Sequence, residues 1–246
     1  MINSRGVKRR WTDENTGTSV ADAAPYEWRR AHDESTGMRR SPSPGSTDCA
    51  RIAVMPCALV YIDPHGKRSP NCTNVDPSCY VEQAITLNRS LLAAGMPTLT
   101  IGTNARPQIE RYLANFTESV RPKLLDLRSS MALPNTTRFY AAHFKLDLLE
   151  QVGKLLPKRV LALMLDTDML ALHPLDQDIL QRCFRSGVGA FDISDQEFSA
   201  YGAGRVIRDL EVVAGKQLNN PRWFGGECLV ASANFIAELV PRARML

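Results

Sequence analysis

The sequence lacks a long hydrophobic run: no uninterrupted apolar segment approaches the ~20 residues that a helix needs to cross a bilayer. The basic residues near the N-terminus are not followed by an apolar segment, so neither a signal peptide nor a transmembrane segment is expected. These absences favour a cytoplasmic protein, with peripheral contact at a membrane left open. The alternative is a secretory lumen, because the chain holds four N-x-S/T sequons, at Asn71, Asn88, Asn115 and Asn135.

The sequence also lacks a strong excess of charge of one sign. Lys and Arg together number 30 against 26 Asp and Glu, which leaves a net charge of +4. A surplus this small does not favour nucleic acid, but it fits a phosphate-bearing ligand or weak contact with anionic lipid. We therefore expect no nucleic-acid partner.

Metal-binding cysteine patterns are missing as well. The six cysteines include no C-x-x-C, and no Cys/His cluster has the spacing of a zinc site. Cys72 and Cys79 could form a disulfide, but unpaired buried thiols in a reducing compartment are the favoured interpretation. With 44% hydrophobic and 23% charged residues, the chain is not collagen-like, a coiled coil or wholly disordered.

Residues 1–50 differ from the remainder of the chain. Ser, Thr, Gly, Pro and mixed charges dominate this segment, and its few apolar residues have no period. Such a segment buries too little apolar surface to offset the entropy lost on ordering. We expect a disordered N-terminal tail at 1–50 and a folded domain at 51–246.

Within the expected domain, strand and helix patterns alternate. Strands are predicted at 59–62, 98–101, 123–127, 159–165, 188–193 and 227–231, and helices at 80–94, 106–116, 138–152, 176–184, 205–214 and from 233. This alternation predicts an α/β domain with a mostly parallel sheet and helices on both faces. The run at 159–165 is apolar on both faces, which is typical of a central strand. Ligands of open α/β sheets bind at the carboxyl ends of the strands, so residues that follow a strand are the site candidates.

The most informative motif is Asp166-Thr167-Asp168, directly after the central run. Two carboxylates this close at the mouth of a buried strand repel each other and need a compensating cation. Hard oxygen ligands suit Mn²⁺ or Mg²⁺, and such an ion also bridges the oxygens of a diphosphate. The alternative is structural, since aspartates after strands also form turns and helix caps.

The segment V-L-A-L-M-L-D-T-D-M-L-A-L-H-P-L resembles the D-x-D region of GT-A-fold glycosyltransferases. It is most similar to the retaining group that includes bacterial lipopolysaccharide galactosyltransferases and glycogenin. The segment R-F-Y-A-A-H-F-K-L upstream resembles an aromatic-rich helix of that family, with Lys145 as the matching cation and Tyr140 and Arg138 as less certain matches. The segment W-F-G-G-E-C-L-V resembles the part of these enzymes where F-N-A-G-V is usual. The resemblance covers roughly 57–240, and the metal motif is its most specific part.

The resemblance implies a GT-A-like, Rossmann-like domain that binds a nucleotide sugar. It implies metal-dependent transfer of a sugar from a nucleoside-diphosphate donor, often uridine diphosphate, to a saccharide, lipid or protein acceptor. Asp168 would ligate the metal, and Asp166 would ligate it or hold the ribose. Lys145 would add positive charge on the phosphates, and Tyr61 and Asp63 occupy positions where such folds hold the nucleoside.

Glu227 is the candidate for acceptor chemistry. Gly225 and Gly226 before it let the backbone approach a ligand closely. A carboxylate at the start of the last strand would face the same cleft as the aspartates and bind acceptor hydroxyls, or act as a base if the enzyme inverts. An exposed turn is the alternative interpretation.

Two hypotheses stay open for the whole chain: a glycosyltransferase domain that is truncated, and a non-catalytic binding domain. The retaining group usually adds a third metal ligand, a His after the F-N-A-G-V region, and no His follows Glu227 here. We therefore expect a domain truncated at its C-terminus, and a non-catalytic domain that binds a sugar nucleotide or a partner is the second hypothesis. A dehalogenase-type phosphatase is disfavoured, because its aspartates lie on the first strand and Leu170 replaces the Thr or Val it needs.

Overall fold

The computed structural model describes residues 51–62, 78–130, 133, 137 and 140–245. Cys49–Leu246 form one compact unit. The expected tail at 1–50 and the candidate Asp63 lie outside the described residues. In the described part of the chain, no helix is both long and apolar enough to span a membrane.

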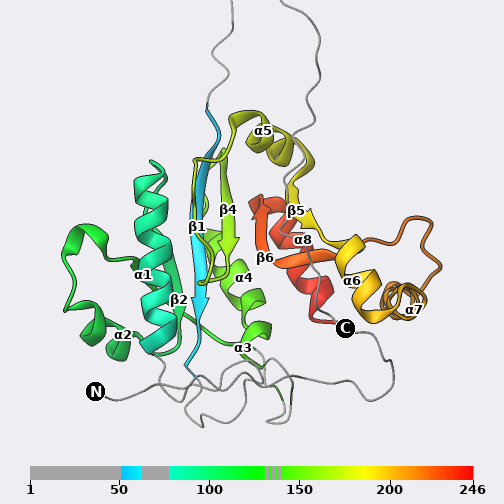
Figure 1. Cartoon of the computed structure of the whole chain (residues 1–246), viewed down its shortest axis with the longest axis horizontal. Helices are drawn as coiled ribbons and strands as arrows, with labels where there is room; N and C mark the ends of the chain where they lie inside the picture. Colours follow the sequence, from blue (N-terminus) through cyan, green and yellow to red (C-terminus); the bar gives the residue numbers. More distant parts are fainter. Residues whose placement is uncertain (1–50, 63–77, 131–132, 134–136, 138–139, 246) are drawn as a thin grey trace, which may run out of the picture. The chain divides into compact units, whose positions relative to one another are not determined.

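A six-stranded sheet forms the centre of the unit (Figure 1). Its strand order is β3-β2-β1-β4-β6-β5, with β1 (Ala53–Val60), β2 (Thr100–Thr103), β3 (Lys123–Asp126), β4 (Val160–Leu165), β5 (Val188–Asp192) and β6 (Phe224–Ala231). The first four strands are mutually parallel, whereas β6 runs antiparallel to both β4 and β5. The predicted α/β class and mostly parallel sheet are thus confirmed.

Helices cover both faces of the sheet, as predicted. They are α1 (Ser78–Ala93), α2 (Arg106–Leu113), α3 (Tyr140–His143), α4 (Lys145–Leu155), α5 (Gln177–Ser186), α6 (Ser194–Tyr201), α7 (Ala203–Ala214) and α8 (Ala233–Ala243), with a 3₁₀ turn η1 at Glu118–Val120. One hydrophobic layer packs strand side chains against α1, α2 and α5, and a second packs them against α4 and α8.

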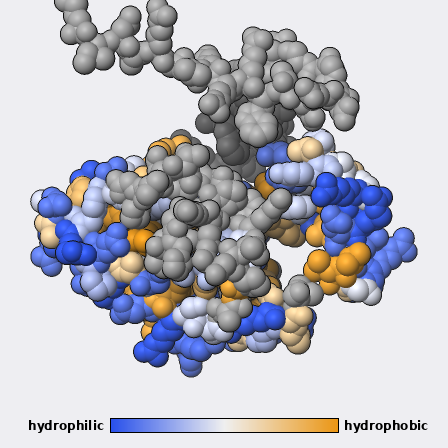
Figure 2. Space-filling model, turned by 90° about the horizontal axis from the view of Figure 1, so that it is seen from below, coloured by the Kyte–Doolittle hydropathy of each residue, from blue (hydrophilic) through white to orange (hydrophobic). Residues whose placement is uncertain are grey.

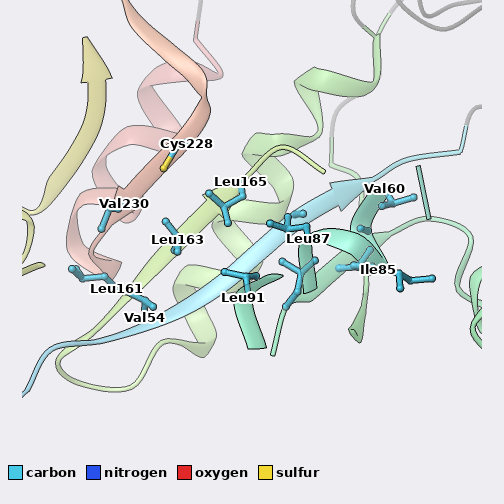
Figure 3. Packing of buried hydrophobic residues seen from close by; sticks show 14 of the residues in the cluster. Val54, Val60, Ile85, Leu87, Leu91, Leu161, Leu163, Leu165, Cys228 and Val230 are labelled. Atoms are coloured by element: carbon cyan, nitrogen blue, oxygen red, sulfur yellow. The ribbon is translucent and has the colours of Figure 1, made fainter. Parts of the chain in front are cut away.

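The central strand β4 contributes to both layers by alternation. Leu161 and Leu163 lie in the first layer and Ala162 in the second, and all three are at most 2% exposed. Figure 3 shows how side chains of β1, β4, β6 and α1 meet in the first layer. A strand that is buried on both faces needs apolar residues at every position, which is why the sequence reads as a continuous apolar run.

An ion pair in the second layer joins α4 to the end of α8. The Asp147 carboxylate is 1% exposed, and its Oδ1 lies 2.6 Å from Arg244 Nη2. The Ser130 hydroxyl donates a second hydrogen bond to the same oxygen at 2.7 Å. A buried carboxylate needs such partners, so these contacts fix the position of α4.

Three predicted elements need correction. The first strand extends over Ala53–Val60 rather than 59–62, although Pro56 lies within it. The helix predicted at 138–152 is divided, because the Phe144 amide donates to the Ala141 carbonyl three residues back, which tightens the turn between α3 and α4. Between the strand predicted at 188–193 and the helix predicted at 205–214 the structure has a further helix, α6, whose first turn holds Asp195 and Glu197, and carboxylates are favoured at that positive end of the helix dipole.

Candidate functional site

The candidate site lies at the carboxyl ends of β1 and β4. From β1 the chain continues to β2 and β3 on one side, and β4 pairs with β1 on the other side. The strand order therefore reverses between β1 and β4, and such a switch point is where open α/β sheets bind ligands. Tyr61 follows β1, and Asp166 and Asp168 follow β4, so the fold brings these predicted residues to one edge.

Lys145 and Asp166 form the central ion pair of this edge. Lys145 Nζ lies 2.5 Å from Asp166 Oδ1 and also donates to the Gly226 carbonyl at 3.0 Å. The Asp166 amide donates to the Glu227 carbonyl at 2.9 Å. Three segments that are distant in sequence, from α4, β4 and β6, therefore meet at one ammonium group.

A cluster of aromatic rings places Lys145. Phe144, which is 1% exposed, precedes α4 and stacks on Tyr61 with ring centroids 4.3 Å apart and an interplanar angle of 5°. Tyr140 approaches both rings edge-on. Because Phe144 is buried against the residue after β1, the next residue, Lys145, is held beside the end of β4. The Tyr61 ring is thus used in packing against both Phe144 and Tyr140.

Asp168 has a different environment from Asp166. Its side chain is exposed, and among the described residues it has no hydrogen-bond or ion-pair partner. The Met169 amide donates to the Asp166 carbonyl at 3.3 Å, which closes a turn around the motif. The motif therefore presents one paired carboxylate and one carboxylate that faces solvent.

Two polar residues of α1 fix this turn, and sequence reasoning missed both. The Thr167 hydroxyl donates to Gln83 Oε1 at 3.1 Å, and the Ala171 amide donates to Ser90 Oγ at 3.0 Å. Gln83 and Ser90 are seven residues apart, which places them on the same side of a helix. That spacing was a signal in the sequence, although it does not say which loop the pair contacts.

Asn104 likewise fixes the backbone at the end of β1. Its side-chain amide donates to the Ile62 carbonyl at 2.8 Å, and its Oδ1 accepts from the Ile62 amide at 2.9 Å. This pair of bonds fixes the chain where it leaves β1 toward Asp63. Asn104 follows β2, so it is a further residue at a strand end that sequence reasoning missed.

Glu227 lies at the same edge because β6 is antiparallel to β4. Cys228 pairs with Leu165, so the start of β6 lies beside the end of β4. The Glu227 side chain is exposed and folds back over Gly225, where a Cβ atom would collide with its carboxylate. A Cβ atom on Gly226 would meet nothing within 4 Å. The backbone at Gly226 is therefore open to a ligand beside Lys145.

Two carboxylates at this edge could contribute ligands to a divalent metal that also binds phosphate. Within the described residues, no group of three or more His, Cys, Asp and Glu side chains could hold a metal alone. The site offers two carboxylates. That of Asp168 faces solvent, and that of Asp166 would bind the metal in place of the Lys145 ammonium group. Mg²⁺ is often held by one or two carboxylates together with substrate phosphates and water, which matches this arrangement.

No family model matches the chain, and no curated protein matches its sequence. The residues at the switch point are therefore the basis on which a function can be inferred. That arrangement consists of a cation, two carboxylates and an open glycine backbone at one sheet edge.

Proposed function

We propose that this chain is a metal-dependent glycosyltransferase of the GT-A type, with 51–246 as its nucleotide-sugar-binding domain. The donor would be a nucleoside-diphosphate sugar, with a UDP-sugar favoured, and the acceptor a saccharide, lipid or protein. The observation that carries the proposal is the contact of Lys145 with Asp166 at the switch point between β1 and β4. It joins the cation and the carboxylate that a metal-bound diphosphate requires.

Asp166 and Asp168 would hold Mn²⁺ or Mg²⁺. When bound, the metal would neutralise the departing diphosphate and act as a Lewis acid on it. Tyr61 and Asp63 would hold the nucleoside. Lys145 would leave Asp166 and place its ammonium on the phosphate oxygens, since it already lies within reach of both the carboxylate and the open Gly226 backbone.

Glu227 would orient the acceptor. In the transfer, the bond between the anomeric carbon and the donor phosphate oxygen breaks, and a bond to the acceptor hydroxyl oxygen forms. If the transfer inverts the anomeric carbon, the hydroxyl proton would pass to the Glu227 carboxylate, and the diphosphate would leave with the electron pair of the broken bond. Glu227 is exposed and has no ion-pair partner among the described residues, so its carboxylate is available for this proton.

Donor binding and hydrolysis test the proposal. The protein is incubated with Mn²⁺ and a panel of nucleotide sugars, and release of nucleoside diphosphate is measured for the wild type, Asp168→Asn and Asp178→Asn. Asp178 is a matched control, because it is exposed on α5, which lies at the opposite end of β4 in Figure 1. We expect loss of metal-dependent release in Asp168→Asn alone. Absence of metal-dependent nucleotide binding in the wild type would overturn the proposal.

A second candidate is a non-catalytic domain that binds a sugar nucleotide or a partner protein. It is favoured by the small metal donor set, because Asp166 is already paired with Lys145 and, of the two aspartates of the motif, Asp168 alone has no partner among the described residues. The same experiment separates the two candidates. Nucleotide binding without diphosphate release, for every donor and acceptor tried, would favour the binding domain.

A further inference from the structure

A pair of aromatic rings lies near the candidate site and takes no part in the chemistry proposed above. Tyr201 at the end of α6 and Trp223 before β6 are stacked, with ring centroids 6.4 Å apart and an interplanar angle of 10°. Tyr201 is 60% exposed, whereas Trp223 is half-buried. Large aromatic surface left in contact with water often marks a binding site.

Hydrogen bonds hold the backbone of Trp223 in place. Its amide donates to Ser194 Oγ at 2.8 Å, and its carbonyl accepts from the Ile193 amide at 2.9 Å. Ser194 is 3% exposed, so the first bond is sheltered from water. The backbone of Trp223 is therefore fixed before any ligand arrives, so ordering it costs no entropy on binding.

A neutral ion pair adjoins Trp223. Arg222 Nη1 lies 3.0 Å from Asp192 Oδ2, and the Ser194 hydroxyl donates to Asp192 Oδ1 at 2.5 Å. The Arg222 and Asp192 side chains are 47% and 39% exposed, so both still present polar atoms to solvent. The pair offers donors and acceptors to a ligand without adding net charge.

The aromatic pair is connected to the site along β6. Trp223 precedes Glu227 by four residues at the start of β6, and four strand residues span about 13 Å. A ligand on Trp223 must therefore extend along β6 to place a hydroxyl at Glu227. This distance favours a ligand of several units over a single small molecule.

We propose that Tyr201 and Trp223, together with Asp192 and Arg222, bind a neutral oligosaccharide that serves as the acceptor. A sugar ring has one face of C–H bonds, which packs on the negative face of an aromatic ring, and a rim of hydroxyls, which bind polar groups. The stacked aromatic rings and the neutral Asp192–Arg222 pair match these two parts. The inference rests on the proposed function, since it assigns the acceptor class of the same site.

A lipid surface is the competing occupant. Figure 2 looks onto the edge where β1 and β4 end and shows hydrophobic residues on the side where α6 and α7 lie. Val212 and Val213 of α7 are 80% and 56% exposed. The neutral Asp192–Arg222 pair adds no attraction for an anionic membrane, so the observations favour the saccharide.

Binding of neutral oligosaccharides tests the proposal without any donor. Glucose, galactose and N-acetylglucosamine oligomers are titrated into the full chain, and saturation-transfer NMR and calorimetry record binding. We expect Trp223→Leu to weaken the affinity about tenfold, because it keeps an apolar side chain but removes the aromatic face. Trp223→Phe should restore most of the affinity. Phe116→Leu, an aromatic residue that packs beside α2, is the matched control and should change nothing.

The outcomes distinguish this inference from the function on which it rests. Trp223→Leu should leave metal-dependent nucleotide binding unchanged, and Asp168→Asn should leave saccharide binding unchanged. Tyr201→Leu provides a second variant at an exposed position if Trp223→Leu does not fold, and we expect it to weaken the affinity as well. Equal saccharide binding by all variants, no binding by the wild type, or binding only to phosphatidylglycerol vesicles would overturn the inference.

Discussion

The two parts of the domain differ in how they are held together. In the part from β1 to β4, most residues of β1, β2 and β4 are buried, and α1 and α4 contribute most of the surrounding core. In the part from β5 to the start of β6, the buried residues of α6 and α7 are Ser194 and Val206 alone, and polar contacts such as Asp192–Arg222 join the segments. The proposed donor site lies on the first part, and the proposed acceptor subsite lies on the second.

This difference agrees with the functions proposed for the two parts. A donor site that holds a metal and a diphosphate needs fixed geometry, which a strand buried on both faces supplies. An acceptor subsite tolerates more local opening, and regions with few buried apolar contacts open most readily. Single substitutions in each part test this difference.

The largest effect is expected in the core of the first part. Leu161→Ala in β4 should lower the free energy of unfolding by about 3 kcal/mol, because the site is 0% exposed and a cavity would remain. Leu172→Ala, at a leucine that is 79% exposed, should change it by less than about 0.5 kcal/mol. Urea denaturation followed by circular dichroism measures both values. Similar losses in the two variants would contradict the packing described for β4.

A smaller effect is expected where the two parts meet, at Lys145. Lys145→Met should weaken the binding of UDP with Mn²⁺ about tenfold, because a charge-assisted contact with the phosphates is lost. The same change should strengthen the binding of Mn²⁺ alone, since no ammonium then competes for Asp166. Calorimetry measures the first quantity and electron paramagnetic resonance of free Mn²⁺ the second.

Lys154→Met is the matched control for that experiment. Lys154 lies on the same helix, but its side chain is 70% exposed and paired with Glu150. It should leave both affinities unchanged. A loss of Mn²⁺ binding in Lys145→Met, rather than a gain, would contradict the competition between Lys145 and the metal.

The sequence was more informative about the first part than about the second. The apolar run of β4 and its exit into Asp166-Thr167-Asp168 were predicted because burial on both faces leaves a strong local pattern. The helix α6 was missed because S-D-Q-E-F-S-A-Y has little apolar periodicity, and among its residues only Ser194 is buried. Weak burial removes the very signal on which the prediction of a helix depends.

In both parts, local sequence patterns did not predict the contacts between distant residues. The resemblance to GT-A enzymes predicted Lys145 as a cation for the donor phosphates, but its ion pair with Asp166 was not predicted. The antiparallel direction of β6 was not predicted, because a strand reads the same in either direction. Yet that direction is what places Glu227 beside Asp166. The contacts of Gln83 and Ser90 with the turn after β4 were missed because a local pattern does not show which distant segments meet.

The smallest effect is expected at Asp192 in the second part. Hydrogen bonds from Ser194 and, to a lesser degree, the charge of Arg222 hold the pKa of Asp192 below its ordinary value. A depressed pKa means that ionised Asp192 stabilises the folded state above its ordinary pKa, and that this contribution is lost as the pH falls through the lower value. Ser194→Ala should therefore raise the pKa of Asp192 toward 3.8, the ordinary value.

NMR titration of the Asp192 carboxyl carbon measures that shift, and hydrogen exchange of the Trp223 amide reports its structural consequence. The Trp223 amide should exchange faster in Ser194→Ala, because its acceptor is removed. Ser199→Ala, on the same helix but bonded only to backbone carbonyls of α6, should alter neither observable. An unchanged exchange rate at Trp223 in Ser194→Ala would mean that apolar packing, and not the hydrogen bond to Ser194, fixes the backbone of Trp223. The second part would then resemble the first, and the contrast between the two would lose its physical basis.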